Sequence, residues 1–248
     1  MTTPAPSPLT IVPRLADALH EGNEPAVMVA NLLRTSVDHA DVERAAVALS
    51  DDAGRLDLVD ATDPVARELL RIQSAHDCGP SVEAHASGRR VTCDGALEML
   101  RRWPRWTSAA VAATVTGVVC LPLRCGDEVL GTLDVYTAGD ATVASASLTA
   151  LETYAAVTAV GLLTRRRLDE QGLLAEQLRR ALDSRVVVEQ AKGVLCASTG
   201  MPLSRAFGVL RAQARHERRP IGDVAAEVVA TLTGPLRGHG AAAATAPC

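Results

Sequence analysis

The side chains best suited to bind a metal gather in the segment HDCGPSVEAH, residues 76–85. It holds His76, Asp77, Cys78 and His85, and Cys93 follows eight residues later. Imidazole, carboxylate and thiolate groups are the ligands that proteins use for zinc and iron. Their spacing here matches no recognised metal pattern, and polar residues normally gather in such a segment between helices. We therefore expect a loop that lines a pocket, with no metal and no cofactor, and keep a metal or haem sensor as the alternative.

Six cysteines, at positions 78, 93, 120, 125, 196 and 248, include no CxxC pair. Free thiols in a reducing cytoplasm are therefore expected. Cys120 and Cys125 fall on or beside expected strands and are interpreted as packing residues, with a redox switch as the alternative.

Lysine occurs once in the chain, as Lys192, against 24 arginines. It lies in the helical stretch AKG, whereas a P-loop needs Gly-Lys-[Ser/Thr] and a protein kinase needs a strand lysine. A receiver domain is excluded in the same way, so Asp51 and Asp52 are interpreted as a hairpin turn. The G-x-S-x-G elbow of serine hydrolases is also absent. We propose no catalytic residue and expect a protein that is not an enzyme.

Both tryptophans, Trp103 and Trp106, lie among three arginines in the segment RRWPRW. Aromatic rings interleaved with arginine can stack on nucleic-acid bases. In a chain that is only 2% aromatic, two large rings more often fill a gap in an alanine-rich core. Core packing is therefore favoured over base stacking.

Composition and charge indicate a globular protein with two different halves. Of 248 residues, 48% are hydrophobic and 22% are charged. Residues 1–174 carry 15 basic and 23 acidic side chains, a balance of −8, and residues 175–248 carry 10 and 6, a balance of +4. The asymmetry predicts that only the second half meets a polyanion. No run reaches the roughly 18 apolar residues of a membrane span, so no membrane partner is expected.

Four regions are expected along the chain. Residues 1–22 are interpreted as disordered with a short helix over 9–19, and residues 234–248 as a disordered tail. Residues 23–164 combine expected hairpins, with apolar arms around DDAG and RCGDE, and expected helices over 25–37, 64–75 and 80–86. That mixture predicts an α+β domain with an antiparallel sheet flanked by helices.

A long helix should join this domain to a C-terminal three-helix bundle over residues 165–233. Only three glycines and no proline occur from Ala146 to Ser198. Leucines recur there at helical spacing, and the helix is expected to loosen near Gly172. An amphipathic helix of this length usually needs a partner to cover its apolar stripe. We therefore expect a homodimer formed through the long helix.

The basic half resembles the ANTAR domain, a three-helix module that binds RNA in transcription antitermination regulators. LRRALDSRVVVEQAKGVL is followed by PLSRAFGVLRAQAR and IGDVAAEVV, in order and with the family's spacing. The matching residues are Ala181, Leu182, Ser184, Arg185, Glu189, Ala191, Lys192, Gly193, Ala206, Phe207, Leu210, Arg211, Val224 and Ala225. Cys196 departs from the methionine that the family often has there.

This resemblance implies that stem-loops in nascent transcripts are the partner. The residues expected to meet RNA are Arg185, Glu189, Lys192, Gly193, Arg211 and Arg215. Arg185 and Lys192 are two helical turns apart and share a face with Glu189, so simple ion pairing on an exposed helix is the alternative. Ala191, Phe207 and Leu210 are expected in the bundle core, with base stacking as the alternative for Phe207. Glycine in a helix costs about 1 kcal/mol, so a close approach by a helix or by RNA is expected at Gly193.

The acidic half resembles a GAF domain, a small-molecule sensor fold of the type fused to ANTAR modules in actinobacteria. The resemblance is carried by CGPSVEAHASGRRVT, RRWPRW and CLPLRCGDEVLGTLDVYTAG. Neither the bilin-attaching cysteine nor a cyclic-nucleotide motif is present, so the signal is an unknown small molecule. The hypothesis is a cytoplasmic, dimeric RNA-binding antitermination regulator. The alternative is a metal, redox or small-molecule sensor that acts by protein–protein interaction without RNA.

Overall fold

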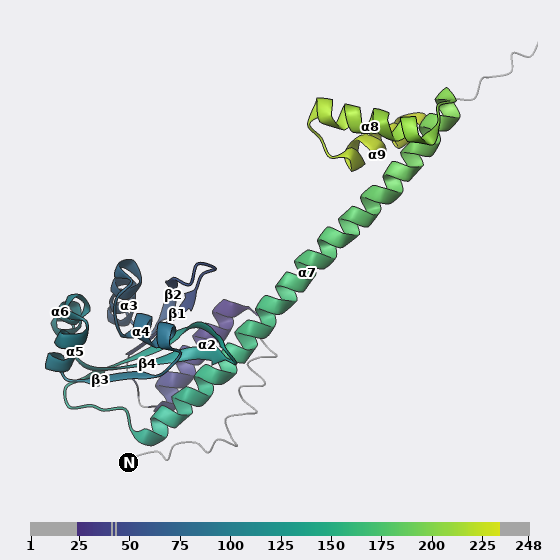
Figure 1. Ribbon diagram of the computed structural model, residues 1–248. Helices are drawn as coiled ribbons and strands as arrows, with labels where there is room; N and C mark the ends of the chain where they lie inside the picture. The colour runs from purple at the N-terminus through teal and green to yellow at the C-terminus, as the bar shows by residue number, and fades with distance from the viewer. Residues whose placement is uncertain (1–23, 41, 43, 234–248) are drawn as a thin grey trace, which may run out of the picture. The chain divides into compact units, whose positions relative to one another are not determined.

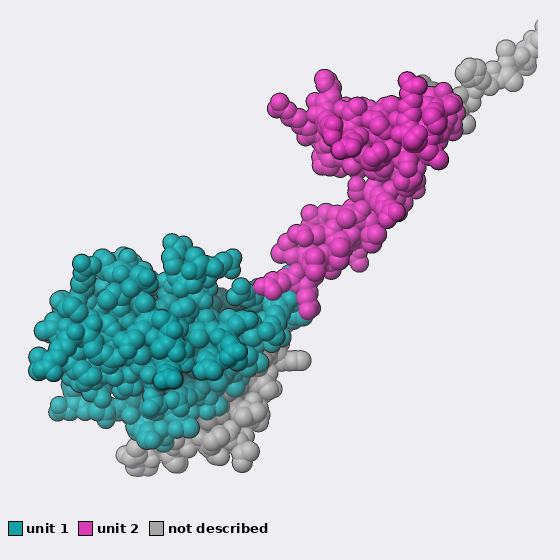
Figure 2. Space-filling model, viewed as in Figure 1, with its two compact units in different colours: residues 1–169 teal, residues 170–248 magenta. Residues whose placement is uncertain are grey.

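The computed structural model describes residues 24–40, 42 and 44–233 (Figure 1). The helix expected over 9–19 and the tail expected over 234–248 lie outside the described residues. The chain forms two compact units, residues 1–169 and 170–248 (Figure 2).

The first unit is built around one antiparallel sheet of five strands in the order β2-β1-β5-β4-β3. The strands are β1 (Arg44–Ser50), β2 (Leu56–Ala61), β3 (Val91–Asp94), β4 (Val115–Cys125) and β5 (Glu128–Ala138). Its helices are α2 (Pro25–Ala40), α3 (Pro64–His76), α4 (Pro80–Ser87), α5 (Ala96–Arg102), α6 (Pro104–Ala112) and the first part of α7 (Ser145–Thr199). The expected α+β fold with an antiparallel sheet is confirmed.

Asp51 closes the β1–β2 hairpin, as the turn interpretation predicted. Its Oδ1 accepts hydrogen bonds from the backbone N–H groups of Ala53 and Arg55, each at 2.9 Å. The Arg55 guanidinium donates to Oδ2 at 2.8 and 3.0 Å. The Asp51 carboxylate therefore accepts the hydrogen bonds of N–H groups in the turn. Gly54, in the same turn, has a φ of +76°.

Helix α3 begins and ends where its sequence predicts. Asp63 is the N-cap and accepts a hydrogen bond from Ala66 N at 2.6 Å, and Pro64 occupies the first turn, where its missing N–H costs nothing. Asp77 ends the helix in the left-handed region, with a φ of 47°. This end directs the chain through Gly79 into α4, which then packs over the sheet.

The sheet is covered on both faces, and the alternation along β5 separates two cores. Leu133 and Val135 face the layer formed by α2 and the start of α7, with Leu151 and Tyr154 among their partners. Tyr136 belongs to the opposite core, and α3 to α6 cover that face of the sheet (Figure 1). The residue two before Tyr136 on the same strand is Asp134, so a buried carboxyl lies on that second face.

Helix α7 is continuous for 55 residues. The loosening expected at Gly172 is therefore not found, because neighbouring helix formers outweigh the roughly 1 kcal/mol that one glycine costs. By length and composition α7 could cross a membrane, but 56% of its most apolar 18-residue stretch is buried inside the protein. Burial to this extent is typical of a helix in the core of a globular domain.

The second unit holds three helices: the last part of α7, α8 (Leu203–Glu217) and α9 (Ile221–Thr233). Their core is small and aliphatic, with Val188, Ala191, Leu210, Ala214, Val224 and Ala225 at its centre. Gly222 lets α9 approach α7 closely, since a Cβ there would lie 2.6 Å from Ser184 Oγ. Small residues thus set the spacing of this bundle.

Candidate functional site

Lys192 is held by an ion pair within its own helix. Its Nζ lies 2.9 and 2.8 Å from Oε1 and Oε2 of Glu189, one turn earlier on α7. Its side chain is only 17% exposed, whereas Arg185 on the same helix is exposed. The ion pairing expected as the alternative is therefore found for Lys192, and it partly neutralises the one lysine of the chain.

Two of the three expected core residues of the bundle are buried, and the third is not. Ala191 and Leu210 are fully buried, but Phe207 is 41% exposed, so its expected place in the core was wrong. Ala206 takes that place, because Ala206, Leu210 and Ala214 repeat every four residues on the buried face of α8. Phe207 is about 100° further round the helix and reaches the surface.

Opposite the buried face, α8 carries a stripe that we name the α8 basic stripe: Ser204, Gly208, Arg211 and Arg215. Their spacing of four, three and four residues places them along one side of the helix. All four are exposed. Within the described residues neither Arg211 nor Arg215 forms an ion pair, whereas Arg219 pairs with Glu217 and Glu227 at 3.0 and 2.8 Å. The stripe therefore presents two uncompensated guanidinium groups.

Gly193 on α7 and Gly208 on α8 leave bare backbone on the surface of the bundle. At Gly193 and Gly208 a Cβ would meet nothing within 4 Å. The helix approach considered for Gly193 is therefore not found among the described residues. Gly208 lies one turn before Arg211, so the stripe has room for a bulky group to approach the backbone beside its arginines.

Sequence reasoning missed Ser204, Gly208 and the exposure of Phe207. The spacing of 204, 208, 211 and 215 was readable in the sequence and would have found the stripe. The exposure of Phe207 was not readable, because an aromatic ring beside an apolar face fits the core equally well by pattern alone.

A second candidate site, which we name the Asp134 cluster, is buried in the first unit: Gln73, Ser81, Cys120, Asp134 and Tyr136. Asp134 Oδ2 accepts hydrogen bonds from Ser81 Oγ, from Tyr136 OH at 3.1 Å and from Gln73 Nε2 at 3.2 Å. Ser81 N donates to Gln73 Oε1 at 2.8 Å. Burial raises the pKa of Asp134, although its hydrogen bonds act in the opposite direction.

The cluster contains three acids and, among the described residues, no base that pairs with Asp134. Burial, and then the charge of Asp134, raise the pKa values of Cys120 and Tyr136 well above their ordinary ranges. Both groups are therefore neutral at physiological pH. Asp134 Oδ1 is buried and has no hydrogen-bond partner within the described residues.

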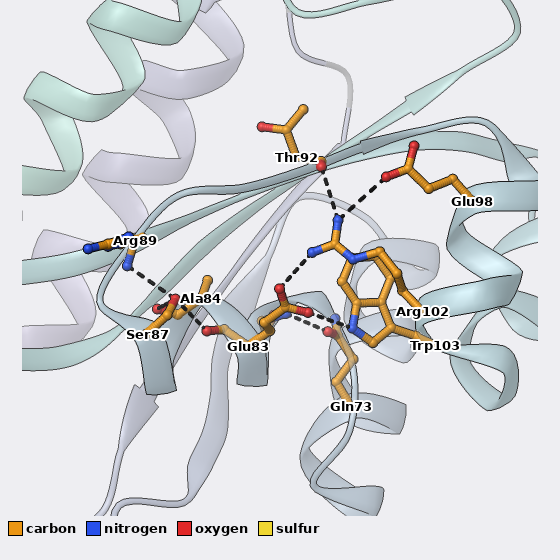
Figure 3. Close-up of polar contacts among 10 residues, drawn as sticks. Gln73, Glu83, Ala84, Ser87, Arg89, Thr92, Glu98, Arg102 and Trp103 are labelled. Atoms are coloured by element: carbon orange, nitrogen blue, oxygen red, sulfur yellow. Dashed lines mark hydrogen bonds and ion pairs between the residues drawn. The ribbon is translucent and has the colours of Figure 1, made fainter.

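On the outer side of α4, Glu83 holds the end of α5 in an arrangement that we name the Glu83 latch (Figure 3). Arg102 donates to Glu83 Oε1 at 2.6 Å, and Trp103 Nε1 donates to Oε2 at 3.2 Å. The Arg102 guanidinium lies 4.3 Å from the centre of the Trp103 ring, a cation–π contact. Arg102 of RRWPRW is thus bound within the domain.

Both tryptophans pack in the core, as favoured from the sequence. Trp103 is 4% exposed and Trp106 is 1% exposed. Their rings meet edge to face with centres 6.0 Å apart, and Trp106 lies 6.3 Å from the ring of Tyr136. Neither ring is accessible to a nucleic-acid base.

The candidate metal ligands of the sequence do not converge. Across the described part of the chain, no three His, Cys, Asp or Glu side chains group as a metal site. His76 lies exposed at the end of α3, and His85 is half-buried on α4. The described cysteines at 78, 93, 120, 125 and 196 are free thiols.

Two family models match the chain: the GAF domain over residues 23–163 and the ANTAR domain over residues 176–229. No curated protein matches its sequence. The GAF domain of an Acinetobacter phosphoenolpyruvate-protein phosphotransferase is similar in structure, with a TM-score of 0.52 and 13% identity, covering 68% of this chain and 99% of that one.

Two further solved structures are similar. A GAF domain/HD domain protein from Geobacter sulfurreducens has a TM-score of 0.48 and 12% identity, covering 62% of this chain and 98% of that one. The free methionine-R-sulfoxide reductase from Neisseria meningitidis, solved with its substrate, has a TM-score of 0.49 and 14% identity, covering 64% and 89%.

The helix-flanked antiparallel sheet corresponds to the first family model, and the small helical bundle corresponds to the second. The chain belongs to the GAF–ANTAR regulators, with a GAF domain over residues 23–163 and an ANTAR domain over residues 176–229. Both families are regulatory rather than catalytic.

Proposed function

We propose that this protein is a cytoplasmic RNA-binding antitermination regulator whose ANTAR domain binds stem-loops in nascent transcripts. The observation that carries the proposal is the α8 basic stripe, in which Arg211 and Arg215 have no acidic partner within the described residues. Phosphate neutralisation by such side chains provides much of the affinity for RNA. The surplus of four positive charges over residues 175–248 also favours binding to the RNA backbone.

Recognition of a loop is assigned to Phe207, the exposed aromatic ring beside the stripe. Proteins read RNA sequence mainly at unpaired bases, which stack on aromatic rings. Gly208 adjoins Phe207 and leaves the backbone open, so a flipped base has space next to the ring. Arg185, Glu189, Lys192 and Gly193 on α7 are proposed as a second contact surface, where Lys192 can exchange Glu189 for a phosphate.

The working form is proposed to be a homodimer through α7. Residues 166–183 are all exposed, whereas most of the stability of a helix in a protein comes from packing of its apolar face. Leu174, Leu178, Leu182 and Val186 follow at four-residue intervals, each more than half exposed. Rows of residues four apart form the ridges by which helices pack, so a second copy of the same helix would cover this stripe.

Replacing Leu178 and Leu182 with glutamate is expected to convert a dimer into a monomer, measured by light scattering during size-exclusion chromatography. The control is Val111→Glu, which places the same charge at an exposed valine of α6. A double variant that stays dimeric would place the interface elsewhere.

Signal transfer is proposed to run along α7, which belongs to both domains without a break. Its first part packs in the core beneath the sheet, through Leu151 and Tyr154. Its last part supplies Val188 and Ala191 to the bundle core. A ligand of the GAF domain regulates RNA binding only if it binds two states of this helix or dimer with different affinity.

The test is RNA binding by the full chain across a salt series, with RNAs that carry paired short hairpins. Wild type is compared with Arg211→Gln/Arg215→Gln and with the control Arg180→Gln/Arg219→Gln, whose arginines are already ion-paired. Loss of two phosphate contacts should reduce the slope of log K against log salt by about 1.4–1.8. A folded dimer that binds no RNA would favour action through protein–protein interaction instead.

A further inference from the structure

The Asp134 cluster contains acidic side chains and no basic one. Three acids, Asp134, Cys120 and Tyr136, lie together, and Gln73 and Ser81 supply only neutral groups. Asp134 is fully buried and has no ion pair within the described residues. A buried carboxyl without a cation is costly, so a positively charged group is the chemical complement that this site lacks.

Several buried polar atoms of this domain have no hydrogen-bond partner within the described residues, among them Thr132 Oγ1 on β5, Asp134 Oδ1 and Trp106 Nε1. Asp134 Oδ1 accepts no hydrogen bond and Trp106 Nε1 donates none within the described residues. Tyr136 connects them, because its hydroxyl donates to Asp134 and its ring lies 6.3 Å from that of Trp106. Because buried polar groups usually have a hydrogen-bond partner, this acceptor and this donor of the same core are available to a bound molecule.

Aromatic rings next to a carboxyl form a favourable environment for an organic cation. Trp103, Trp106 and Tyr136 all belong to the core beneath α3 to α6. A cation over an aromatic face gains about 0.5–2 kcal/mol, most when it is removed from water. The aromatic rings and the Asp134 carboxyl therefore both favour a positively charged ligand.

Helix α4 packs on β4 and β5, the strands that carry Cys120, Asp134 and Tyr136, and polar contacts hold it on two sides. Its buried residues are small, namely Pro80, Ser81 and Ala84. Ser81 contacts Asp134 and Gln73 on the inside, and Glu83 contacts Arg102 and Trp103 on the outside (Figure 3). An element with little buried apolar surface opens at lower cost than the strands beneath it.

We propose that the Asp134 cluster is the ligand site of the GAF domain, that its ligand is a small organic cation with a hydrogen-bond acceptor, and that α4 is the lid. Asp134 pairs with the cation, Trp106 Nε1 donates to the acceptor, and the Glu83 latch opens to admit the molecule. The inference rests on the proposed sensor function and names its ligand chemistry. RNA binding by the α8 basic stripe does not depend on it.

The test uses the two tryptophans, both buried in this core, as fluorescent reporters in the full-length protein. Three probes of similar shape are titrated: 4-hydroxybenzamidine, benzamidine and 4-hydroxybenzamide. Binding should be strongest for the first, weaker for benzamidine, which lacks the hydroxyl acceptor, and absent for the neutral amide.

The matched variants are Asp134→Asn, which keeps the size of the side chain, and Asp127→Asn in the exposed β4–β5 turn. Asp134→Asn should weaken cation binding at least tenfold, and Asp127→Asn should leave it unchanged. Glu83→Gln should speed association in stopped-flow measurements by weakening the latch. Equal binding by Asp134→Asn, preference for the neutral amide, or no binding by either cation would overturn the proposal. Salt-sensitive RNA binding that persists in those cases would leave the proposed function intact.

Discussion

Arginine and aromatic residues occur together twice in this chain, in RRWPRW of the GAF domain and in AFGVLRAQAR of the ANTAR domain, and the two segments have opposite surroundings. In the first, Trp106 is 1% exposed and Arg102 is bound by Glu83. In the second, Phe207 is 41% exposed, and Arg211 forms no ion pair within the described residues. Both segments combine residue types that can bind nucleic acid.

The difference shows that surroundings decide the role of such a motif. The tryptophans lie beneath helices that cover a sheet, where their rings gain by leaving water. Phe207 lies one position past the buried face of an alanine-rich helix. The first motif therefore stabilises a domain, and the second is available to a partner.

The largest effect should come from the buried ring. Trp106→Ala is expected to lower the free energy of unfolding of the GAF domain by about 3–5 kcal/mol, because the core cannot refill so large a volume. Urea denaturation measures the loss. RNA affinity of the folded fraction should stay unchanged; a variant of normal stability with weakened RNA binding would reverse the comparison.

Phe207→Ala should show the opposite behaviour. RNA affinity is expected to fall by about 1–3 kcal/mol, the cost of losing one stacked base, while the ANTAR domain keeps its melting temperature. Leu203→Ala, at an exposed leucine one turn earlier on α8, is the control in the same binding assay. Unchanged RNA affinity together with lowered stability would return Phe207 to a packing role.

Asp134→Asn should stabilise the GAF domain in a pH-dependent way. Burial raises the pKa of Asp134 above the ordinary value of 3.8, so the folded state holds a proton that the unfolded chain releases. The free energy of unfolding of the wild type therefore falls as pH rises from the pKa of Asp134 in the unfolded chain to its pKa in the folded domain. Above that second pKa it is level. Of the facing groups, Cys120 and Tyr136 stay neutral throughout this range.

Asparagine cannot ionise, and its carbonyl can accept the same hydrogen bonds. The variant should match the wild type near pH 4 and exceed it at neutral pH, as measured by thermal denaturation across pH. A pH-independent difference would contradict the raised pKa. A gain in stability with a loss of cation binding is the pattern expected of a residue kept for function.

The smallest effect should come from Lys192→Gln. Losing the pair with Glu189 should cost the helix about 0.2–0.5 kcal/mol, measured by thermal denaturation. RNA affinity should fall less than on replacing Arg211 and Arg215, because the Lys192 side chain is only 17% exposed. A larger loss would show that RNA draws Lys192 away from Glu189.

Much of the architecture could be predicted because its signals are local. Asp63 and Pro64 mark the start of α3, and Asp51 marks a turn, through hydrogen bonds that span only a few residues. The uninterrupted leucine pattern predicted α7. The Asp134 cluster could not be predicted, because Gln73, Ser81 and Asp134 come from α3, α4 and β5 and meet only after the sheet has formed.

By itself the sequence determined the two families, the order of their domains, the long helix and the basic character of the ANTAR half, since motif spacing and charge count need no coordinates. Only the tertiary structure decided which arginines are paired, which aromatic rings are buried, and that a carboxyl without a cation lies beneath α4. These properties depend on which side chains become neighbours across the fold. That information is not contained in the spacing of residues along any one element.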